Sequence, residues 1–207
     1  MLNRLGKRIA QFFYVNSIIK EKEDIEVYAY GLEILISSLS SILAVLLIGI
    51  FCNQLIGSIL FFLAFIPLRT YSGGYHAKTH AMCFVILIVV YIINLISISY
   101  IADSIIVNAI LMSMMFSSVV IYTLAPIDDK NKRLSEMQKK KYRRIALYIL
   151  IAQIVIVTTL LMVGMSTRNL LAFTNGQLSA STSLIAVKIN KRKDDKNERH
   201  NFSISQI

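Results

Sequence analysis

The chain has 207 residues, of which 56% are hydrophobic and 16% charged, against about 25% charged in an ordinary soluble domain. The formal net charge of +10 would suit a nucleic-acid-binding protein, but charged and apolar residues are segregated along the chain. Several stretches approach the roughly 18 apolar residues that cross a bilayer, and basic loops in such proteins mark the cytoplasmic side and anionic lipid. We therefore expect an all-α polytopic membrane protein with no nucleic-acid partner.

Residues 1–26 form a charged N-terminal arm. Its apolar positions 2, 5, 9, 12 and 13 recur every three to four residues, which predicts an amphipathic helix lying on the membrane surface. An acidic patch follows at 21–26. Both a solvated face before the first span and a docking surface for a peptide fit this pattern.

Six hydrophobic stretches follow the arm. Those at 32–51, 81–101, 104–125 and 145–165 are long enough to span a bilayer. The stretch at 55–67 covers only about 20 Å of a 30 Å core, so we expect it to extend into the next loop, to tilt little or to be re-entrant. The stretch at 170–187 is weak because polar residues such as Asn175 and Gln177 interrupt it. The prediction is about six transmembrane helices, five plus a weak sixth, in one membrane domain over 1–187.

The basic residues indicate the orientation of these spans. Of the 22 Lys and Arg residues, 21 lie in the arm, the segment 69–83, the hydrophilic loop 126–144 and the tail 188–207. The connections between them carry only Arg168. The positive-inside rule therefore places both termini and the segment 69–83 on the cytoplasmic side. We expect the charged tail 188–207 to be disordered.

The segment 69–83 reads RTYSGGYHAKTHAMC and is a polar interruption between apolar stretches. Cys83 would lie near the first turn of the next span, where the helix dipole favours a thiolate nucleophile. A histidine could serve as its base. Spacing favours His80, three residues before Cys83, over His76, which an unbroken helix would place about 10 Å away along its axis. Gly73 and Gly74 loosen the chain just before His76 without proving that it folds back.

Other readings of these residues remain open. Cys83 could be a small apolar filler in a non-catalytic membrane scaffold. His76, His80 and Cys83 could instead hold a metal in a metal-binding protein or transporter, although no fourth ligand is evident. Arg69 could anchor the membrane edge or bind a carboxylate or an oxyanion. Carboxylate-based intramembrane proteolysis is not expected, because Glu33 is nearly the only acidic residue in a span.

The pattern of Arg69, Gly74, His76 and Cys83 resembles the core of the accessory gene regulator B (AgrB) family of membrane endopeptidases. The run Gly-Gly-x-His-Ala-Lys at 73–78 matches closely, as does the Pro-x-Asp start of the loop at 126–128 and the basic run after it. Chain length and span pattern also fit, so the resemblance covers nearly the whole chain.

The resemblance implies a cysteine-type endopeptidase of the bacterial cell membrane. It would cut a small AgrD-type propeptide near its C-terminal side through a thioester and help form a cyclic autoinducing peptide for quorum sensing. Carried over by position, Cys83 is the nucleophile and His76 the base, with His80 as the alternative base. Arg69, Gly73, Gly74 and Lys78 are supporting positions. The resemblance also implies a homodimer, no cofactor and no metal.

Overall fold

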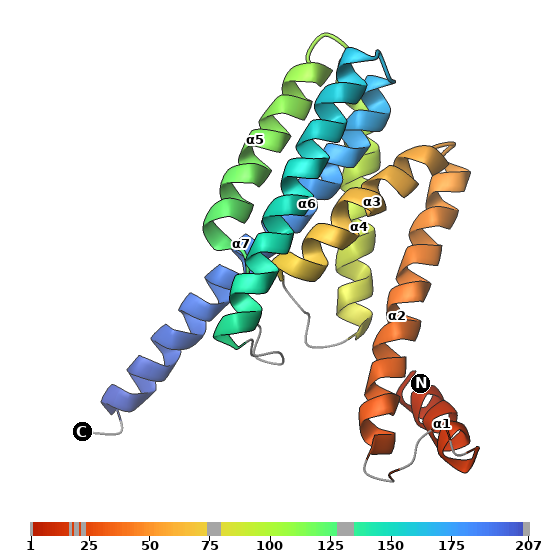
Figure 1. The fold of residues 1–207 in the computed structure, drawn as a ribbon, viewed down its shortest axis with the longest axis vertical. Helices are drawn as coiled ribbons and strands as arrows, with labels where there is room; N and C mark the ends of the chain where they lie inside the picture. The colour runs from red at the N-terminus through yellow and green to blue at the C-terminus, as the bar shows by residue number, and fades with distance from the viewer. Residues whose placement is uncertain are drawn as a thin grey trace. The chain divides into compact units, whose positions relative to one another are not determined.

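The computed structural model describes residues 2–16, 18, 21, 24–73, 80–127 and 135–204, with side chains left out at 2, 3, 80 and 193–204. Within these ranges the chain forms helices and no strands. The helices are α1 (Leu2–Val15), α2 (Asp24–Phe51), α3 (Leu55–Ser72), α4 (His80–Tyr100), α5 (Ile106–Leu124), α6 (Glu136–Met162) and α7 (Thr167–Ile204) (Figure 1). The all-α prediction is confirmed.

In the described part of the chain, five helices, α2 to α6, are long and apolar enough to cross a membrane. At most 39% of the apolar window in any of them is buried inside the protein, so most of their side chains face outward. A soluble protein rarely exposes so much contiguous apolar surface, whereas lipid tails accept it. The chain is a multi-pass membrane protein.

The second span, α3, extends past Pro67 into the next segment, which is one of the outcomes expected from the sequence. It runs for 18 residues with Pro67 inside it, which corresponds to about 27 Å of helix. The re-entrant alternative took Pro67 as the end of the helix. Proline removes one backbone donor, and membrane helices tolerate this loss. The helix therefore carries Arg69 in its last turn.

The helix α6 also begins earlier than expected, inside the segment 126–144 that we predicted as a loop. Ser135 caps it: the Ser135 side chain accepts a hydrogen bond from the Gln138 backbone, and the Gln138 side chain accepts one from the Ser135 N–H. This capping box makes the basic residues 139–144 the first turns of α6. The helix α7 likewise continues to Ile204, through the tail that we expected to be disordered. That stretch contains no glycine or proline that would break a helix.

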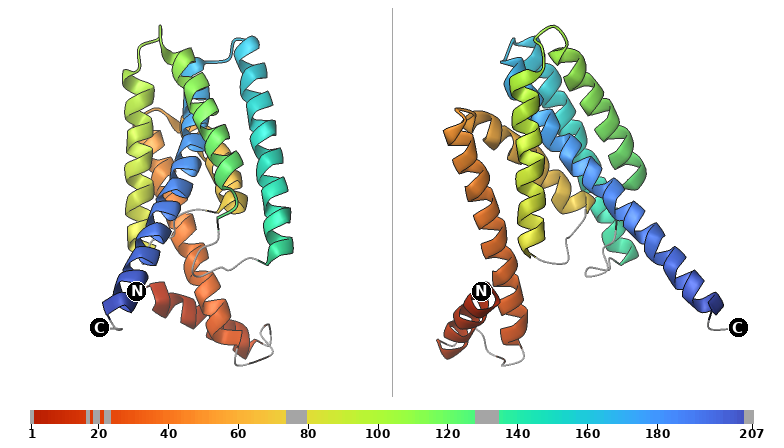
Figure 2. Two further views of the ribbon diagram at one scale, coloured as in Figure 1. Left: turned by 90° about the vertical axis from the view of Figure 1, so that its left-hand side faces the viewer. Right: turned by 180° about the vertical axis from the view of Figure 1, so that it is seen from behind.

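The chain divides into two compact units, and the first comprises residues 1–52 and 77–92. In it α1 packs on α2 (Figure 2) through the small residues Gly6 and Ala10. A Cβ atom at Gly6 would lie 2.7 Å from the Ala29 carbonyl oxygen, so the two backbones are in close contact. The other edge of the apolar face of α1, with Leu5 and Phe12, is exposed.

The second unit comprises residues 53–76 and 93–207. In it α7 packs against α3, α5 and α6 (Figures 1 and 2). Its polar residues bond to neighbouring helices: Asn175 donates to Asn94 (2.9 Å) and Ser97 (2.7 Å), and Gln177 donates to Gln153 (2.9 Å). The predicted sixth span, 170–187, lies in α7. Its hydropathy is low because it contains polar residues that form hydrogen bonds with other helices.

Arg168, at the start of α7, bonds to the end of α4 and the turn after it. Its guanidinium donates to the Ile98 carbonyl oxygen at 2.6 Å and to the Asp103 carboxylate at 2.8 Å. The single basic residue outside the four basic segments is therefore engaged with the end of α4 and the turn after it.

Candidate functional site

The candidate nucleophile, Cys83, lies in the first turn of α4. Its side chain is exposed and its thiol is free. The backbone N–H groups of this turn have no partner within the helix, as at any helix start. The only other cysteine, Cys52, is also free and exposed, at the turn after α2. Location in a first helical turn is what distinguishes Cys83 from Cys52.

The structure describes the side chain of neither candidate base. Three of the predicted site residues, Gly74, His76 and Lys78, lie outside the described residues. His80 is the first residue of α4, and the placement of its side chain is not described. The choice between His76 and His80 therefore stays a prediction.

Arg69 lies in the last turn of α3, where a cation is favourable beside the negative end of the helix dipole. Its guanidinium carbon is 5.7 Å from the centre of the Phe65 ring, and Phe65 in turn stacks on Phe61. The arginine thus rests on an aromatic ladder that runs along α3.

Gly73 ends α3 in a conformation that only glycine adopts readily, with φ of 82° and ψ of −170°. A Cβ atom there would lie 2.5 Å from the Ile127 carbonyl oxygen. The Ile127 N–H donates to the Ser72 carbonyl oxygen at 3.1 Å, just after the cis Ala125–Pro126 bond. The structure therefore brings Gly73 against Ile127, a contact that sequence reasoning did not predict.

The basic start of α6 reaches towards the same end of α3. Tyr142 packs edge-on against Tyr71, with ring centres 5.7 Å apart. Lys139 pairs with Glu136 at 3.0 Å, and the Arg143 guanidinium lies over the Tyr122 ring. Lys140, Lys141 and Arg144 are exposed. Of the five cations at 139–144, two are thus engaged within the protein and three face outward.

Among the residues the structure describes, no three His, Cys, Asp or Glu side chains are close enough together to hold a metal ion. His76 and the His80 side chain lie outside that set. The metal-binding alternative, which needs both histidines, therefore stays a prediction.

Comparison with known proteins decides the family. The accessory gene regulator B profile matches residues 6–190, most of the chain. This chain belongs to the accessory gene regulator B family. It is 31% identical over 147 residues to AgrB-like protein 2 of Clostridium perfringens (strain 13 / Type A), covering 68% of each chain. The AgrB-like protein of C. perfringens strain SM101 matches with the same identity and coverage. No solved structure matches the chain.

Membership of the accessory gene regulator B family supports a peptide-processing role in quorum sensing, with an AgrD-type peptide as substrate. The family profile covers α3, α4 and the segment between them. The features singled out in the sequence, from Arg69 to Cys83, therefore lie inside the family region.

Proposed function

We propose that the chain is a membrane cysteine endopeptidase that cuts an AgrD-type propeptide near its C-terminal side. The observation that carries this proposal is the free, exposed Cys83 in the first turn of α4, within the region matched by the family profile. The motif residues Arg69, Gly73, Gly74, His76 and Lys78 lie within 14 residues of it in sequence.

The proposed reaction begins with the Cys83 thiolate, from which His76 has taken the proton. The sulfur attacks a propeptide carbonyl carbon, and the negative charge develops on the carbonyl oxygen. Backbone N–H groups in the first turn of α4, which have no partner within the helix, would stabilise this oxyanion. The C–N bond then breaks, His76 gives its proton to the leaving amine, and the C-terminal fragment departs.

The remaining thioester joins Cys83 to the N-terminal part of the propeptide. A cysteine or serine side chain within that part can attack the thioester, which frees Cys83 and closes a thiolactone or lactone ring without ATP. Water must be kept away during this step, and a site at the membrane edge would help to exclude it. The proposed location is the cytoplasmic face of the bacterial cell membrane, because 21 of the 22 basic residues lie on that predicted side. We also propose a homodimer.

Exchange of the two histidines tests the choice of base. Loss of a general base costs about 10²- to 10⁴-fold in rate. We expect His76→Ala to lower propeptide cleavage by this factor and His80→Ala to leave it within about threefold of the wild type. The measurement is cleavage after co-expression with the propeptide, read by mass spectrometry. The reverse pattern would transfer the role of base to His80.

Gly73 provides a test of the contact with Ile127. Gly73→Ala would combine backbone strain of about 1–3 kcal/mol with a clash against the Ile127 carbonyl, and should reduce cleavage at least tenfold by displacing the start of the motif. Gly164 is the matched control, because its φ of 79° is similar and nothing lies within 4 Å of an added Cβ. Gly164→Ala should lose some thermal stability and keep full cleavage. Equal cleavage by both variants would contradict a role for the Gly73 contact.

The outward cations of α6 are the proposed contact for an acidic part of the propeptide. Neutralising Lys140, Lys141 and Arg144 to glutamine should raise KM about tenfold, at about 0.5 kcal/mol for each exposed charge, and leave kcat unchanged. The charge-preserving triple variant Lys140→Arg, Lys141→Arg, Arg144→Lys should keep the wild-type KM. An unchanged KM in the glutamine variant would remove these cations from substrate binding.

A further inference from the structure

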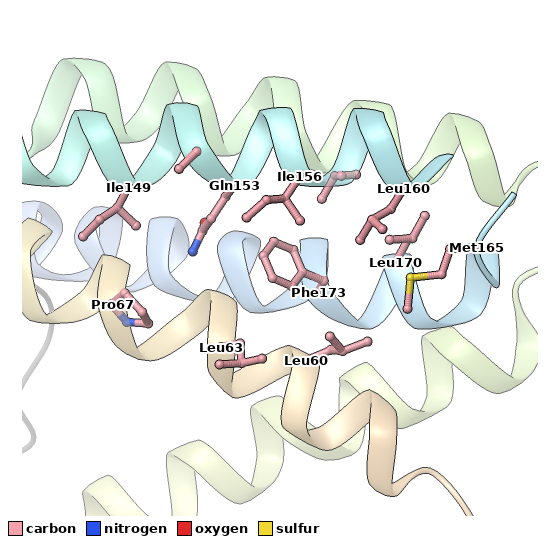
Figure 3. Close-up of a pocket in the computed structure, with 12 residues that line it drawn as sticks. Leu60, Leu63, Pro67, Ile149, Gln153, Ile156, Leu160, Met165, Leu170 and Phe173 are labelled. Carbon is pink, nitrogen blue, oxygen red and sulfur yellow. The ribbon is translucent and has the colours of Figure 1, made fainter. Parts of the chain in front are cut away.

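An apolar groove of about 370 Å³ runs along the second unit, between α3 and α6 and floored by α7 (Figure 3). Eleven of its twelve lining residues are apolar. Pro67 and Ile149 lie at one end, and Leu160 and Met165 at the other. The groove thus follows the direction of two helices that can span the membrane.

The one polar side chain in the groove, Gln153, is already engaged. It is only 4% exposed. Its Nε2 donates to the Ala64 carbonyl oxygen at 3.0 Å, and its Oε1 accepts from Gln177 Nε2 at 2.9 Å. Both polar atoms of the amide have partners inside the protein, so the groove wall presents a ligand with apolar surface.

The rim of the groove is apolar as well. Leu63 on α3 is 57% exposed and Ile156 on α6 is 47% exposed. A neighbouring face of α6 is also exposed and apolar, with Tyr148, Ile151 and Val155 in register. Side chains of this kind on a membrane-spanning helix face lipid, so the groove opens towards the hydrocarbon of the bilayer.

We propose that this groove holds one phospholipid acyl chain. A flexible hydrocarbon chain fills an irregular apolar groove and needs no hydrogen bonds. Helices that associate within a membrane do so through small residues and interhelical hydrogen bonds, whereas most of the residues that line this groove are large and apolar and its one polar side chain is engaged. If the proposed function holds, the bound acyl chain has a further effect. Pro67 lines the groove and lies two residues before Arg69, so the lipid stabilises the end of α3 that leads into the motif.

Filling the groove tests this proposal. Ala152 lines it and is exposed, so Ala152→Phe would place a ring where the acyl chain lies. Val155→Phe adds a ring to the neighbouring lipid-facing surface outside the groove and is the matched control. The full chain would be purified in mild detergent, and the phospholipid retained for each chain measured by native mass spectrometry, before and after adding phosphatidylglycerol.

The wild type and Val155→Phe should retain one phospholipid that survives extended washing, and Ala152→Phe should lose it. Added phosphatidylglycerol should raise the thermal stability of the first two proteins and not of the third. If Ala152→Phe does not fold, Leu63→Phe narrows the groove from the α3 side and should give the same loss. Equal lipid retention in the groove-filled protein would overturn the proposal. A change of oligomeric state or of propeptide KM in Ala152→Phe, with lipid retention unchanged, would also overturn it, because that result would identify a protein-binding surface. Lipid retention does not depend on cleavage. The lipid proposal can therefore fail while the peptidase proposal holds, and the peptidase proposal can fail while the lipid proposal holds.

Discussion

Cys83→Ser should reduce propeptide cleavage by at least about a thousandfold. The serine hydroxyl is nearly isosteric with the thiol, but it is a much weaker nucleophile near neutral pH. Any acyl group that it accepted would form an ester, which transfers to a second nucleophile far more slowly than a thioester does. The measurement is the yield of the C-terminal fragment on co-expression with the propeptide, normalised to the amount of membrane-inserted protein.

The chain carries its own control for this substitution. Cys52 is also exposed and free, and lies in the turn after α2. Cys52→Ser should leave both cleavage and thermal stability at wild-type values. Equal losses in the two variants would point to general thiol chemistry or misfolding rather than to a nucleophile at position 83.

Gly176→Val should destabilise the second unit by more than about 3 kcal/mol, which is above the usual cost of overpacking. A Cβ atom at Gly176 would meet the Phe61 carbonyl oxygen and would lie 3.0 Å from the Ala64 Cβ. The obstacle is the backbone of α3, which cannot rotate away as a side chain can. The helices α3 and α7 would have to separate. Gln153 of α6 bonds both the Ala64 carbonyl of α3 and Gln177 of α7, so this separation would also strain the two hydrogen bonds.

The matched control for Gly176 is Gly31, which is exposed on α2 with nothing within 4 Å of an added Cβ. Gly31→Ala should keep or slightly raise stability, since alanine favours a helix over glycine by up to about 1 kcal/mol. Thermal unfolding in detergent measures both variants. A Gly176→Val protein as stable as the wild type would show that α3 and α7 are not packed as closely as the structure has them.

The spans that face lipid were predictable from the sequence. The helices α4 and α5 begin and end within two residues of the stretches expected at 81–101 and 104–125. Their hydropathy carries the signal because at most 33% of their apolar windows is buried inside the protein, which leaves the rest of each helix available to lipid. The helix α7 gave a weak signal for the opposite reason: Asn175, Gln177 and Ser181 are polar because they bond to other helices.

The misplaced boundaries have local causes. The stretch predicted at 55–67 ends at Pro67, but a membrane helix continues past proline when the rest of its backbone stays bonded. The cap at Ser135 is visible in the sequence as Ser-x-x-Gln. The segment was nevertheless predicted as a loop because so many charged residues follow the cap.

The candidate site was predictable only where it is local in sequence. The position of Cys83 in a first helical turn followed from where the apolar stretch begins. The packing of Gly73 against Ile127 and of Tyr71 against Tyr142 joins residues more than 50 positions apart, and no local pattern encodes such pairs. The base is still assigned by resemblance alone.

Trapping the thioester tests the central claim most directly. The propeptide would carry alanine in place of its own ring-closing cysteine or serine, so that cleavage could proceed but the acyl group could not leave by cyclisation. Intact-protein mass spectrometry should then show the wild type heavier by the mass of the N-terminal propeptide fragment, on Cys83 and released by hydroxylamine. Cys83→Ala should show neither adduct nor cleavage. Cleavage by Cys83→Ala, with no adduct on the wild type, would contradict a cysteine endopeptidase.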